Sequence, residues 1–174
     1  MKKALILPVV VLFCICLVVS AALAATNQVT APIIEEAEAK AAEEARLQVM
    51  PAATDGFQPV QAAGLPETVA EVYKANNGAG FVFMLTTKGY GGEMKLICGI
   101  DADGNITACR TMSHGETPGL GSKTTESEFR DQFVGQDESL SGVSAITGAT
   151  ISSTAYIGAI RDAFTAFQIV KEAA

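Results

Sequence analysis

The chain opens with a long, almost uninterrupted apolar segment. Residues 4–25 are nearly all apolar, and Lys2 and Lys3 are the only basic residues near them. About 20 apolar residues in a helix cross a bilayer, so we expect a transmembrane anchor over residues 1–25. Because both lysines precede the segment, the positive-inside rule predicts a cytoplasmic N-terminus and export of everything that follows.

The same segment has one feature of a cleaved signal peptide. Ala22-Leu23-Ala24 is similar to a small-residue cleavage site, but the apolar run is longer than the roughly 7–15 residues of a signal-peptide core. We therefore favour a retained single-pass anchor in the cell (inner) membrane. Both interpretations place residues 26–174 on the outer, periplasmic side.

A polar stretch separates the anchor from a second helical pattern. Residues 26–31 are polar and predict a short spacer. From Pro32 to Val49 the chain is rich in Ala and Glu, with a weak apolar stripe at helical spacing, which predicts a stalk helix. Residues 51–66 contain three prolines and two glycines, which predicts irregular structure. We assign residues 26–64 to stalk and linker, and residues 65–174 to one compact domain.

The compact domain begins with strand-like patterns and ends with helical ones. Alternating or continuous apolar runs separated by glycine- and asparagine-rich bends, among them Gly89-Tyr90-Gly91-Gly92, predict a series of strands. A broad apolar face at helical spacing predicts a long C-terminal helix. The predicted strands are 69–74, 80–87, 93–100, 106–112 and a short one at 142–146, and the predicted helices are 127–133 and about 153–171. The pattern is that of an α+β fold with a compact antiparallel or mixed sheet.

The turn at residues 101–105 allows two registers for the hairpin around it. A two-residue turn pairs Cys98 directly with Cys109, whereas a three-residue loop with a left-handed Gly104 pairs Asp101 with Asn105. Only the second register separates most apolar side chains from polar ones. We therefore predict that register, with the two cysteines on opposite faces of the hairpin and their thiols free.

Composition excludes several classes of function. The formal net charge is −7, every acidic residue lies beyond the anchor, and no basic stripe is present, so nucleic-acid binding is not expected. The four cysteines lack zinc-type spacing and the chain has a single histidine, so we expect no metal site. His114 is expected to be a hydrogen-bonded loop histidine rather than part of a catalytic triad.

Candidate chemistry gathers in two glycine-containing segments. Residues 147–153 read Thr-Gly-Ala-Thr-Ile-Ser-Ser at the start of the predicted C-terminal helix. The unpaired amides and partial positive charge of a helix N-terminus bind phosphate, although hydroxyl side chains there also serve as ordinary caps. Residues 114–122, His-Gly-Glu-Thr-Pro-Gly-Leu-Gly-Ser, predict a shaped loop.

Together these two segments resemble a known family. Glu116-Thr117-Pro118-Gly119-Leu120-Gly121, followed about 30 residues later by the 147–153 run, is similar to the FMN-binding domain of membrane electron-transport complexes. That family includes the G subunit of the Rnf ferredoxin:NAD⁺ oxidoreductase and the C subunit of the sodium-translocating NADH:quinone reductase. The likeness extends over residues from about 65 to 170, and the preceding anchor and stalk helix also match. The short distance between anchor and domain is more similar to the Rnf protein.

The resemblance implies a cofactor and a set of residues that hold it. In the family, the threonine that closes the Gly-Ala-Thr run carries FMN through a phosphoester bond, which corresponds to Thr150 here. The loop at 116–121 would then lie against the flavin ring, with Gly119 and Gly121 permitting close approach of the backbone. The implied cofactor-binding residues are Thr147, Gly148, Ala149, Thr150, Ser152, Ser153, Glu116, Thr117, Gly119 and Leu120; no catalytic residue is implied.

The resemblance also implies a role and partners. It points to an electron-carrier subunit of an ion-translocating oxidoreductase, redox-active within the complex and not catalytic alone. The expected partners are the other membrane subunits, and a flavin transferase during maturation. The alternatives are an exported flavin carrier or flavin-dependent reductase outside any complex, or the C subunit of the quinone reductase. One departure from the family pattern is Ser144, where the attachment motif usually has Asp.

Overall fold

The computed structural model describes residues 2–173, without the side chains of residues 2–7, 35, 38 and 173. The chain divides into two units, Met1–Ala42 and Glu43–Ala174. The first contains most of one long helix. The second contains the end of that helix, the sheet and the remaining helices, and it holds all the residues discussed below as a site.

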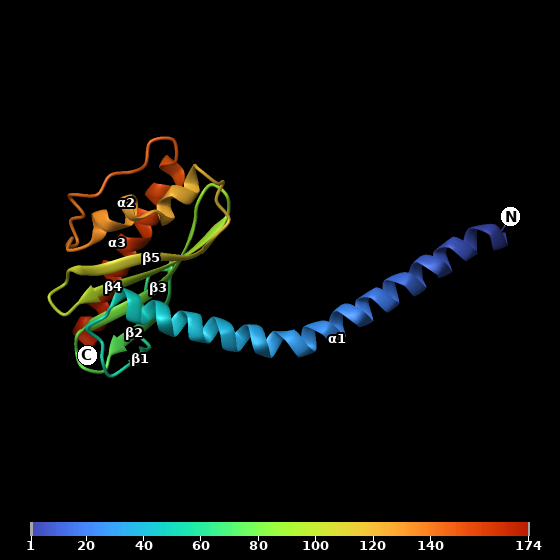
Figure 1. Cartoon of the computed structure of the whole chain (residues 1–174), viewed down its shortest axis with the longest axis horizontal. Helices are drawn as coiled ribbons and strands as arrows, with labels where there is room; N and C mark the ends of the chain where they lie inside the picture. Colours follow the sequence, from blue (N-terminus) through green and yellow to red (C-terminus); the bar gives the residue numbers. More distant parts are fainter. Residues whose placement is uncertain (1, 174) are drawn as a thin grey trace. The chain divides into compact units, whose positions relative to one another are not determined.

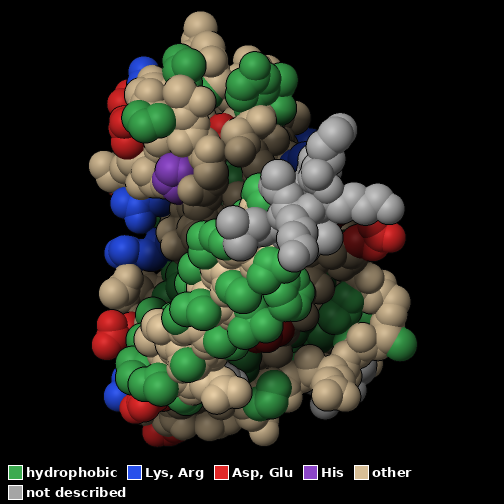
Figure 2. Space-filling model, turned by 90° about the vertical axis from the view of Figure 1, so that its right-hand side faces the viewer, with side chains coloured by type: hydrophobic (Ala, Val, Ile, Leu, Met, Phe, Trp, Pro, Cys, Tyr) green, Lys and Arg blue, Asp and Glu red, His purple; other side chains and the backbone are tan. Residues whose placement is uncertain are grey.

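The N-terminal part is one continuous helix, α1, from Lys2 to Val49. Its stretch from Pro8 onward is long and apolar enough to cross a membrane, with a mean hydropathy of 2.8 over the most apolar window. The large apolar side chains between Val9 and Ile34 are exposed, whereas Val49 at the end of the helix is fully buried. Figure 2 shows that hydrophobic side chains gather on this face of the molecule. An exposed apolar helix of this length is what a membrane anchor requires.

The expected spacer at residues 26–31 is instead helical, so anchor and stalk form a single helix. The hydroxyl of Thr26 donates to the carbonyl of Ala22 at 2.9 Å, and that of Thr30 donates to the carbonyl of Thr26 at 3.0 Å. These polar side chains therefore satisfy their hydrogen bonds within the helix. Pro32 lies inside the helix, where it removes one backbone hydrogen bond and favours a kink.

The compact unit is built on a five-stranded antiparallel sheet in the order β1-β2-β3-β4-β5 (Figure 1). Each strand pairs with the next one along the chain. The strands are β1 (Phe57–Val60), β2 (Val69–Ala75), β3 (Gly80–Lys88), β4 (Glu93–Asp101) and β5 (Ile106–His114). The four strands predicted between residues 69 and 112 are confirmed, and the α+β class with them.

Strand β1 lies in a segment for which the sequence predicted irregular structure. It is only four residues long and contains Pro59, which pairs with Tyr73 of β2. Because β1 is an edge strand, the N–H that proline lacks is not needed by a further neighbour. A proline-containing edge strand of this length has no alternating pattern long enough to be recognised.

Helices follow β5 and cover one face of the sheet. A 3₁₀ turn, η1 (Gly121–Thr125), leads to the short helix α2 (Ser127–Arg130), a second 3₁₀ turn, η2 (Asp131–Phe133), and finally the long helix α3 (Thr150–Ala173). Phe129 and Phe133 stack edge to face, with ring centroids 5.4 Å apart. The helical segment predicted over 127–133 is confirmed, and it consists of α2 followed by η2. The C-terminal helix begins three residues earlier than predicted.

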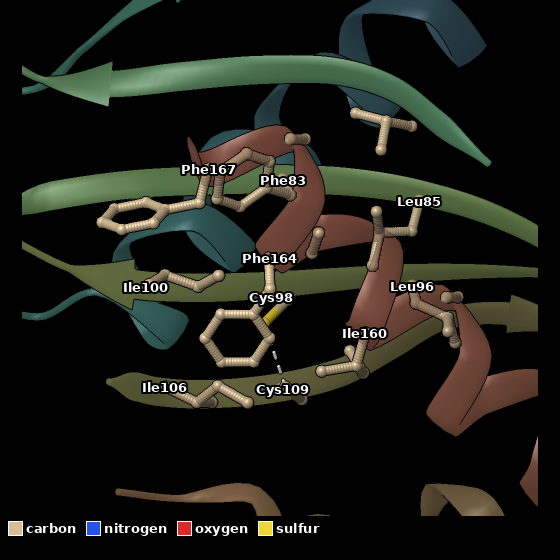
Figure 3. Packing of buried hydrophobic residues seen from close by; sticks show 14 of the residues in the cluster. Phe83, Leu85, Leu96, Cys98, Ile100, Ile106, Cys109, Ile160, Phe164 and Phe167 are labelled. Carbon is tan, nitrogen blue, oxygen red and sulfur yellow. Dashed lines mark hydrogen bonds between the residues drawn. The ribbon is translucent and has the colours of Figure 1, made fainter. Parts of the chain in front are cut away.

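The sheet has a core on each face. Side chains of β2 to β5 pack against α3 and α2 in the larger core (Figure 3). The opposite face carries a smaller core beneath the end of α1, built around Val49, Met50, Val82 and Ile97, which are all fully buried. Both faces of the central strands are therefore apolar, which is unusual for an antiparallel sheet.

This two-sided burial explains why the predicted register of the β4–β5 hairpin is wrong. At the turn, the Asp101 amide donates to the carbonyl of Asn105 at 2.9 Å, as expected. The register then shifts between Gly99 and Ile100, so that Cys98 lies directly opposite Cys109. The prediction assumed one apolar and one polar face, and that assumption cannot select a register where both faces are buried. The thiols are free, as predicted, but they share one face.

The strand predicted at residues 142–146 is absent, and the segment is an irregular loop. Three alternate amides donate to side chains rather than to a strand: Gly142 to Gln136 at 3.1 Å, Ser144 to Gln132 at 3.0 Å, and Ile146 to Ser153 at 3.1 Å. An extended segment whose amides are satisfied in this way has no need of a sheet partner. The apolar residues Val143 and Ile146 do pack against the larger core. The side chains that accept hydrogen bonds from this segment could not be predicted from the apolar pattern.

Candidate functional site

Helix α3 begins at Thr150, immediately after a sharp bend of the backbone. Gly148 has a φ of +83°, which is left-handed and strongly favours glycine. The first helical hydrogen bond of α3 is donated by the Ser153 amide to the carbonyl of Ala149 at 3.0 Å. The amides of the first turn therefore precede the hydrogen-bonded ladder and carry the partial positive charge of the helix N-terminus. Thr150 itself is exposed.

A cavity of about 420 Å³ lies against this helix N-terminus. It is formed by three segments that are far apart in the sequence: the β3–β4 hairpin, the loop after β5, and the start of α3. The residues that line it are Tyr90, Glu116, Thr117, Leu120, Gly121, Gly148, Ala149, Thr150, Ile151 and Ser152. The fold thus brings together seven of the ten residues that the sequence assigned to a cofactor, together with Gly121.

Glu116 joins the three segments. Its side chain is only 6% exposed. One carboxylate oxygen accepts a hydrogen bond from the Gly91 amide at 3.0 Å, and the other accepts one from the Ser152 hydroxyl at 2.7 Å. A Cβ on Gly121 would collide with this carboxylate, so glycine is required there for close approach. Glu116 lines the cavity, as expected of a cofactor-binding residue, and its two hydrogen bonds also make it a clamp between the segments.

The two serines of the run have separate environments although they are adjacent. Ser152 is buried, and its hydroxyl donates to Glu116 and accepts from the Tyr90 amide at 3.3 Å. Ser153 is fully buried, and its hydroxyl accepts from the Ile146 amide and donates to the carbonyl of Ala149 at 2.9 Å. Ser153 does not line the cavity; it fastens the preceding loop to the helix.

Thr147 and Gly119 are the other predicted residues that do not line the cavity. Thr147 lines a second hollow of about 320 Å³, together with Gln132, Ser144 and residues of η1 and α2. Gly119 has a φ of +77°, and its amide donates to the Ser122 hydroxyl at 2.8 Å. Gly119 thus forms the turn that presents Leu120.

Three large exposed side chains rim the cavity: Tyr90 (75% exposed), Leu120 (52%) and Ile151 (60%). Such side chains around a concave site are typical of small-molecule binding. Tyr90 and Ile151 were not predicted from the sequence, where the glycine-rich bend at Tyr90 indicated only a turn. The sequence did contain one signal for Tyr90: an aromatic residue between glycines in a bend has no evident packing role, which indicates a role in binding.

The positive and negative contributions to the cavity come from different groups: the helix N-terminus attracts anions, and Glu116 is the one acidic residue of the lining. The first turn of α3 contains no acidic residue, and the ten lining residues include no lysine or arginine. The helix N-terminus is thus the main source of positive potential in the lining. His114 is not among the lining residues, and its Nδ1 accepts a hydrogen bond from the Glu116 amide at 3.2 Å, as predicted, but it is the last residue of β5 rather than a loop residue.

Comparison with known proteins defines the class to which this site belongs. Residues 89–165, which include all the residues that line the cavity, match the FMN-binding domain family. The protein is therefore one that contains an FMN-binding domain, with its cavity at the N-terminus of α3.

Relatives along the whole chain define the family more narrowly. The chain is 35% identical over 186 residues to the G subunit of the Na⁺-translocating ferredoxin:NAD⁺ oxidoreductase complex of Acetobacterium woodii, covering 91% of this chain and 89% of that one. It is also 35% identical over 170 residues to the G subunit of the ion-translocating oxidoreductase complex of Methanosarcina acetivorans, covering 89% and 90%. The chain belongs to this family of G subunits of ion-translocating (Rnf) oxidoreductase complexes.

A solved structure is also similar: the C subunit of the Na⁺-translocating NADH-quinone reductase from Parabacteroides distasonis. The TM-score is 0.44 and the identity 21%, over 66% of this chain and 62% of that one.

Proposed function

We propose that this chain is an electron-carrier subunit whose FMN is covalently attached to Thr150. The observation that carries the proposal is the position of Thr150: it is exposed, it is the first residue of α3, and it borders the cavity. A phosphate ester on its hydroxyl would lie at the helix N-terminus, where the first-turn amides stabilise negative charge. Formation of the ester by the transferase requires a donor in which the phosphate of FMN is part of a phosphoanhydride: Thr150 Oγ1 loses its proton and bonds to that phosphorus, the anhydride P–O bond breaks, and the other phosphate leaves with its substituent.

The residues present fit the size and polarity of a flavin. The cavity volume of about 420 Å³ is within the range of small-molecule sites. Leu120 and Tyr90 offer an apolar and an aromatic side chain for contact with a planar ring, and Thr117 offers a polar one. Glu116 has both carboxylate oxygens engaged, so its role is to hold the walls of the site in place.

FMN, when bound, would supply the electron-transfer chemistry, and the protein supplies attachment, orientation and an electrostatic environment. The described lining contains no histidine, lysine or cysteine that could act as a general acid, base or nucleophile. Of the lining groups that can transfer a proton, Glu116 has both carboxylate oxygens engaged and Tyr90 lies at the rim, so the arrangement is suited to a relay. The proposed donors and acceptors of electrons are therefore the other membrane subunits of the ion-translocating complex.

We further propose that the compact unit lies on the outer side of the cell membrane. Support comes from Lys2 and Lys3, which precede the apolar stretch of α1 and favour a cytoplasmic N-terminus. A covalent tether would prevent loss of the flavin from that compartment. Co-purification of a retained anchor with other membrane subunits distinguishes this role from that of a carrier acting outside a complex.

The attachment site is tested by fluorescence of the denatured protein on a gel. The full chain is produced in a host that contains a flavin transferase, as wild type and as the Thr150→Ala and Thr147→Ala variants. We expect a fluorescent band from wild type and from Thr147→Ala, and none from Thr150→Ala. Both threonines are exposed, so each change should alter the free energy of unfolding by no more than about 0.5 kcal/mol.

The possible results separate attachment from binding. A non-fluorescent wild-type band, with FMN released on denaturation, would show binding without a covalent bond. A fluorescent Thr150→Ala band would show that FMN is attached to another hydroxyl. Loss of fluorescence in Thr147→Ala, with Thr150 intact, would show that the second hollow takes part in attachment.

A further inference from the structure

The larger core contains two thiols that face each other across adjacent strands. Cys98 of β4 and Cys109 of β5 are directly paired in the sheet, and they are 0% and 3% exposed. The thiol of Cys109 donates a hydrogen bond to the sulfur of Cys98 over 3.2 Å (Figure 3). They lie beneath Phe164 and Ile160 of α3, neither of them lines the cavity, and the proposed function makes no use of them.

The geometry of the pair meets the requirements for a disulfide. Residues directly opposite each other in an antiparallel sheet have Cα atoms about 4.5 or 5.5 Å apart, and disulfides bridge Cα separations of about 4.4–6.8 Å. The two sulfurs already point toward each other, so a bond requires a small change in side-chain torsions rather than a movement of the backbone.

We propose that Cys98 and Cys109 are a modification site, a dithiol that an organic disulfide converts to an intramolecular disulfide joining β4 to β5. One cysteine thiolate attacks the organic disulfide, forming a mixed disulfide and expelling one thiolate. The second cysteine loses its proton and attacks the sulfur of the first, expelling the other thiolate. Two S–H bonds are broken and one S–S bond is formed, while the organic disulfide is reduced to two thiols.

The sheet provides a route of access to the buried pair. β5 is an edge strand, so the sulfurs can be uncovered by separating β5 from β4, together with the contacts of β5 to η1, α2 and η2, while the other strands stay paired. The ladder between them is interrupted on both sides of the pair, at Lys95/Leu96 and at Gly99/Ile100. Irregular pairing of this kind lowers the cost of local opening. Oxidation is therefore expected to depend on opening of this hairpin rather than on global unfolding.

The thiols are protected while the hairpin is closed. Burial, followed by the hydrogen bond with Cys98, raises the pKa of Cys109 well above its usual value. Since the thiolate is the attacking species, exchange is slow in the closed state and the dithiol persists under reducing conditions. Once formed, the disulfide is shielded by the same core.

The disulfide would link two elements that lead into the cavity. β5 continues directly into the loop that contains Glu116, and β4 follows the hairpin that contains Gly91. A bond between the strands would restrict the separation of these segments. The cysteine pair does not contact the cavity, so this proposal does not depend on the proposed function, and each can be tested without the other.

Mass spectrometry of the full chain tests the proposal. The Cys14→Ser/Cys16→Ser variant removes the thiols of α1 and leaves only the pair. The folded protein is treated with excess oxidised glutathione, quenched with acid, denatured and alkylated. Cleavage before Asp101 and Asp103 separates the two cysteines, so a disulfide is seen as two linked, unalkylated peptides. We expect this product, and its disappearance after treatment with dithiothreitol.

Stability supplies a second measurement on the same sample. Oxidation should raise the thermal midpoint by roughly 5–10 °C, because the bond restricts the unfolded chain, and reduction should reverse the rise. The Cys98→Ala and Cys109→Ala variants should each show no such rise and retain one thiol that can be alkylated. Two fully alkylated cysteines after oxidation, or stable mixed disulfides with glutathione at both positions, would overturn the proposal.

Discussion

Two side chains hold the segment around Thr150 through the same pattern of hydrogen bonds, in different environments. Glu116 accepts hydrogen bonds from a backbone amide and a serine hydroxyl, and so does Gln132, whose Oε1 accepts from the amide and the hydroxyl of Ser144 at 3.0 and 3.2 Å. Glu116 is buried and links segments far apart in the chain. Gln132 is half-buried and binds one exposed serine.

The difference shows that the same hydrogen-bond pattern can have unequal energetic weight. Removing Glu116 would leave the buried Ser152 hydroxyl without its acceptor and would leave a void under the cavity wall, whereas the exposed Gly91 amide could bond to water. Removing Gln132 would expose the polar atoms of Ser144 to solvent, which can replace it. The cavity wall is therefore expected to depend on Glu116, whereas the second hollow is expected to tolerate substitution.

The largest predicted effect is the loss of this buried clamp. Glu116→Ala should lower the free energy of unfolding by about 3 kcal/mol, while the matched Gln132→Ala should lower it by roughly 0.5 kcal/mol. Denaturant unfolding of both variants measures the difference. Equal losses of stability in the two variants would show that burial does not make the hydrogen bonds of Glu116 more important than those of Gln132.

A smaller effect is predicted for the backbone bend between the clamps. Gly148→Ala places a Cβ in open space but at a φ of +83°, so it should destabilise the protein by about 1–2 kcal/mol through backbone strain alone. Gly158 lies within α3 and also has open space around its Cβ position. There, substitution by Ala should stabilise by about 0.5–1 kcal/mol. Changes of the same sign in thermal unfolding would refute this contrast.

The smallest effect on stability at neutral pH is predicted for a buried hydroxyl that has no hydrogen-bond partner. The hydroxyl of Tyr156 is buried near Thr111, but neither hydroxyl makes a hydrogen bond of ordinary geometry. Tyr156→Phe should therefore change the stability at pH 7 by less than about 1 kcal/mol. A larger loss would show that the hydroxyl has a partner, such as a buried water.

At alkaline pH, the stability of Tyr156→Phe should differ more clearly from that of the wild type. Burial, followed by the nearby Cys109 and Cys98, raises the pKa of Tyr156 well above its usual 10.0. The folded state therefore keeps its proton when the unfolded chain has lost it, and stability falls as the pH rises above about 10. In Tyr156→Phe the fall should be shallower by up to about 1.4 kcal/mol per pH unit. Parallel pH profiles of the thermal midpoint would contradict this assignment.

The sequence alone determined most of the architecture. The apolar run, the alternation at residues 69–112 and the helical face near the C-terminus each extend over many positions, so local pattern was sufficient. The two motif segments were also recognisable from the sequence, since glycine, proline and hydroxyl residues in a short run have few alternative uses. β1 and the loop at 142–146 were not predicted correctly, because a short proline-containing strand and amides bound to side chains leave no periodic signal.

Tertiary structure decided which atoms face one another. Ser152 and Ser153 are chemically identical and adjacent in the sequence, yet one supports the cavity and the other fastens a loop, because successive helical residues point in different directions. Cys98 and Cys109 were predicted on opposite faces, and a one-residue shift in the ladder placed them in contact. Sequence pattern reports how polar a position is, whereas partner choice depends on register and on contacts between distant segments, which only the folded chain defines.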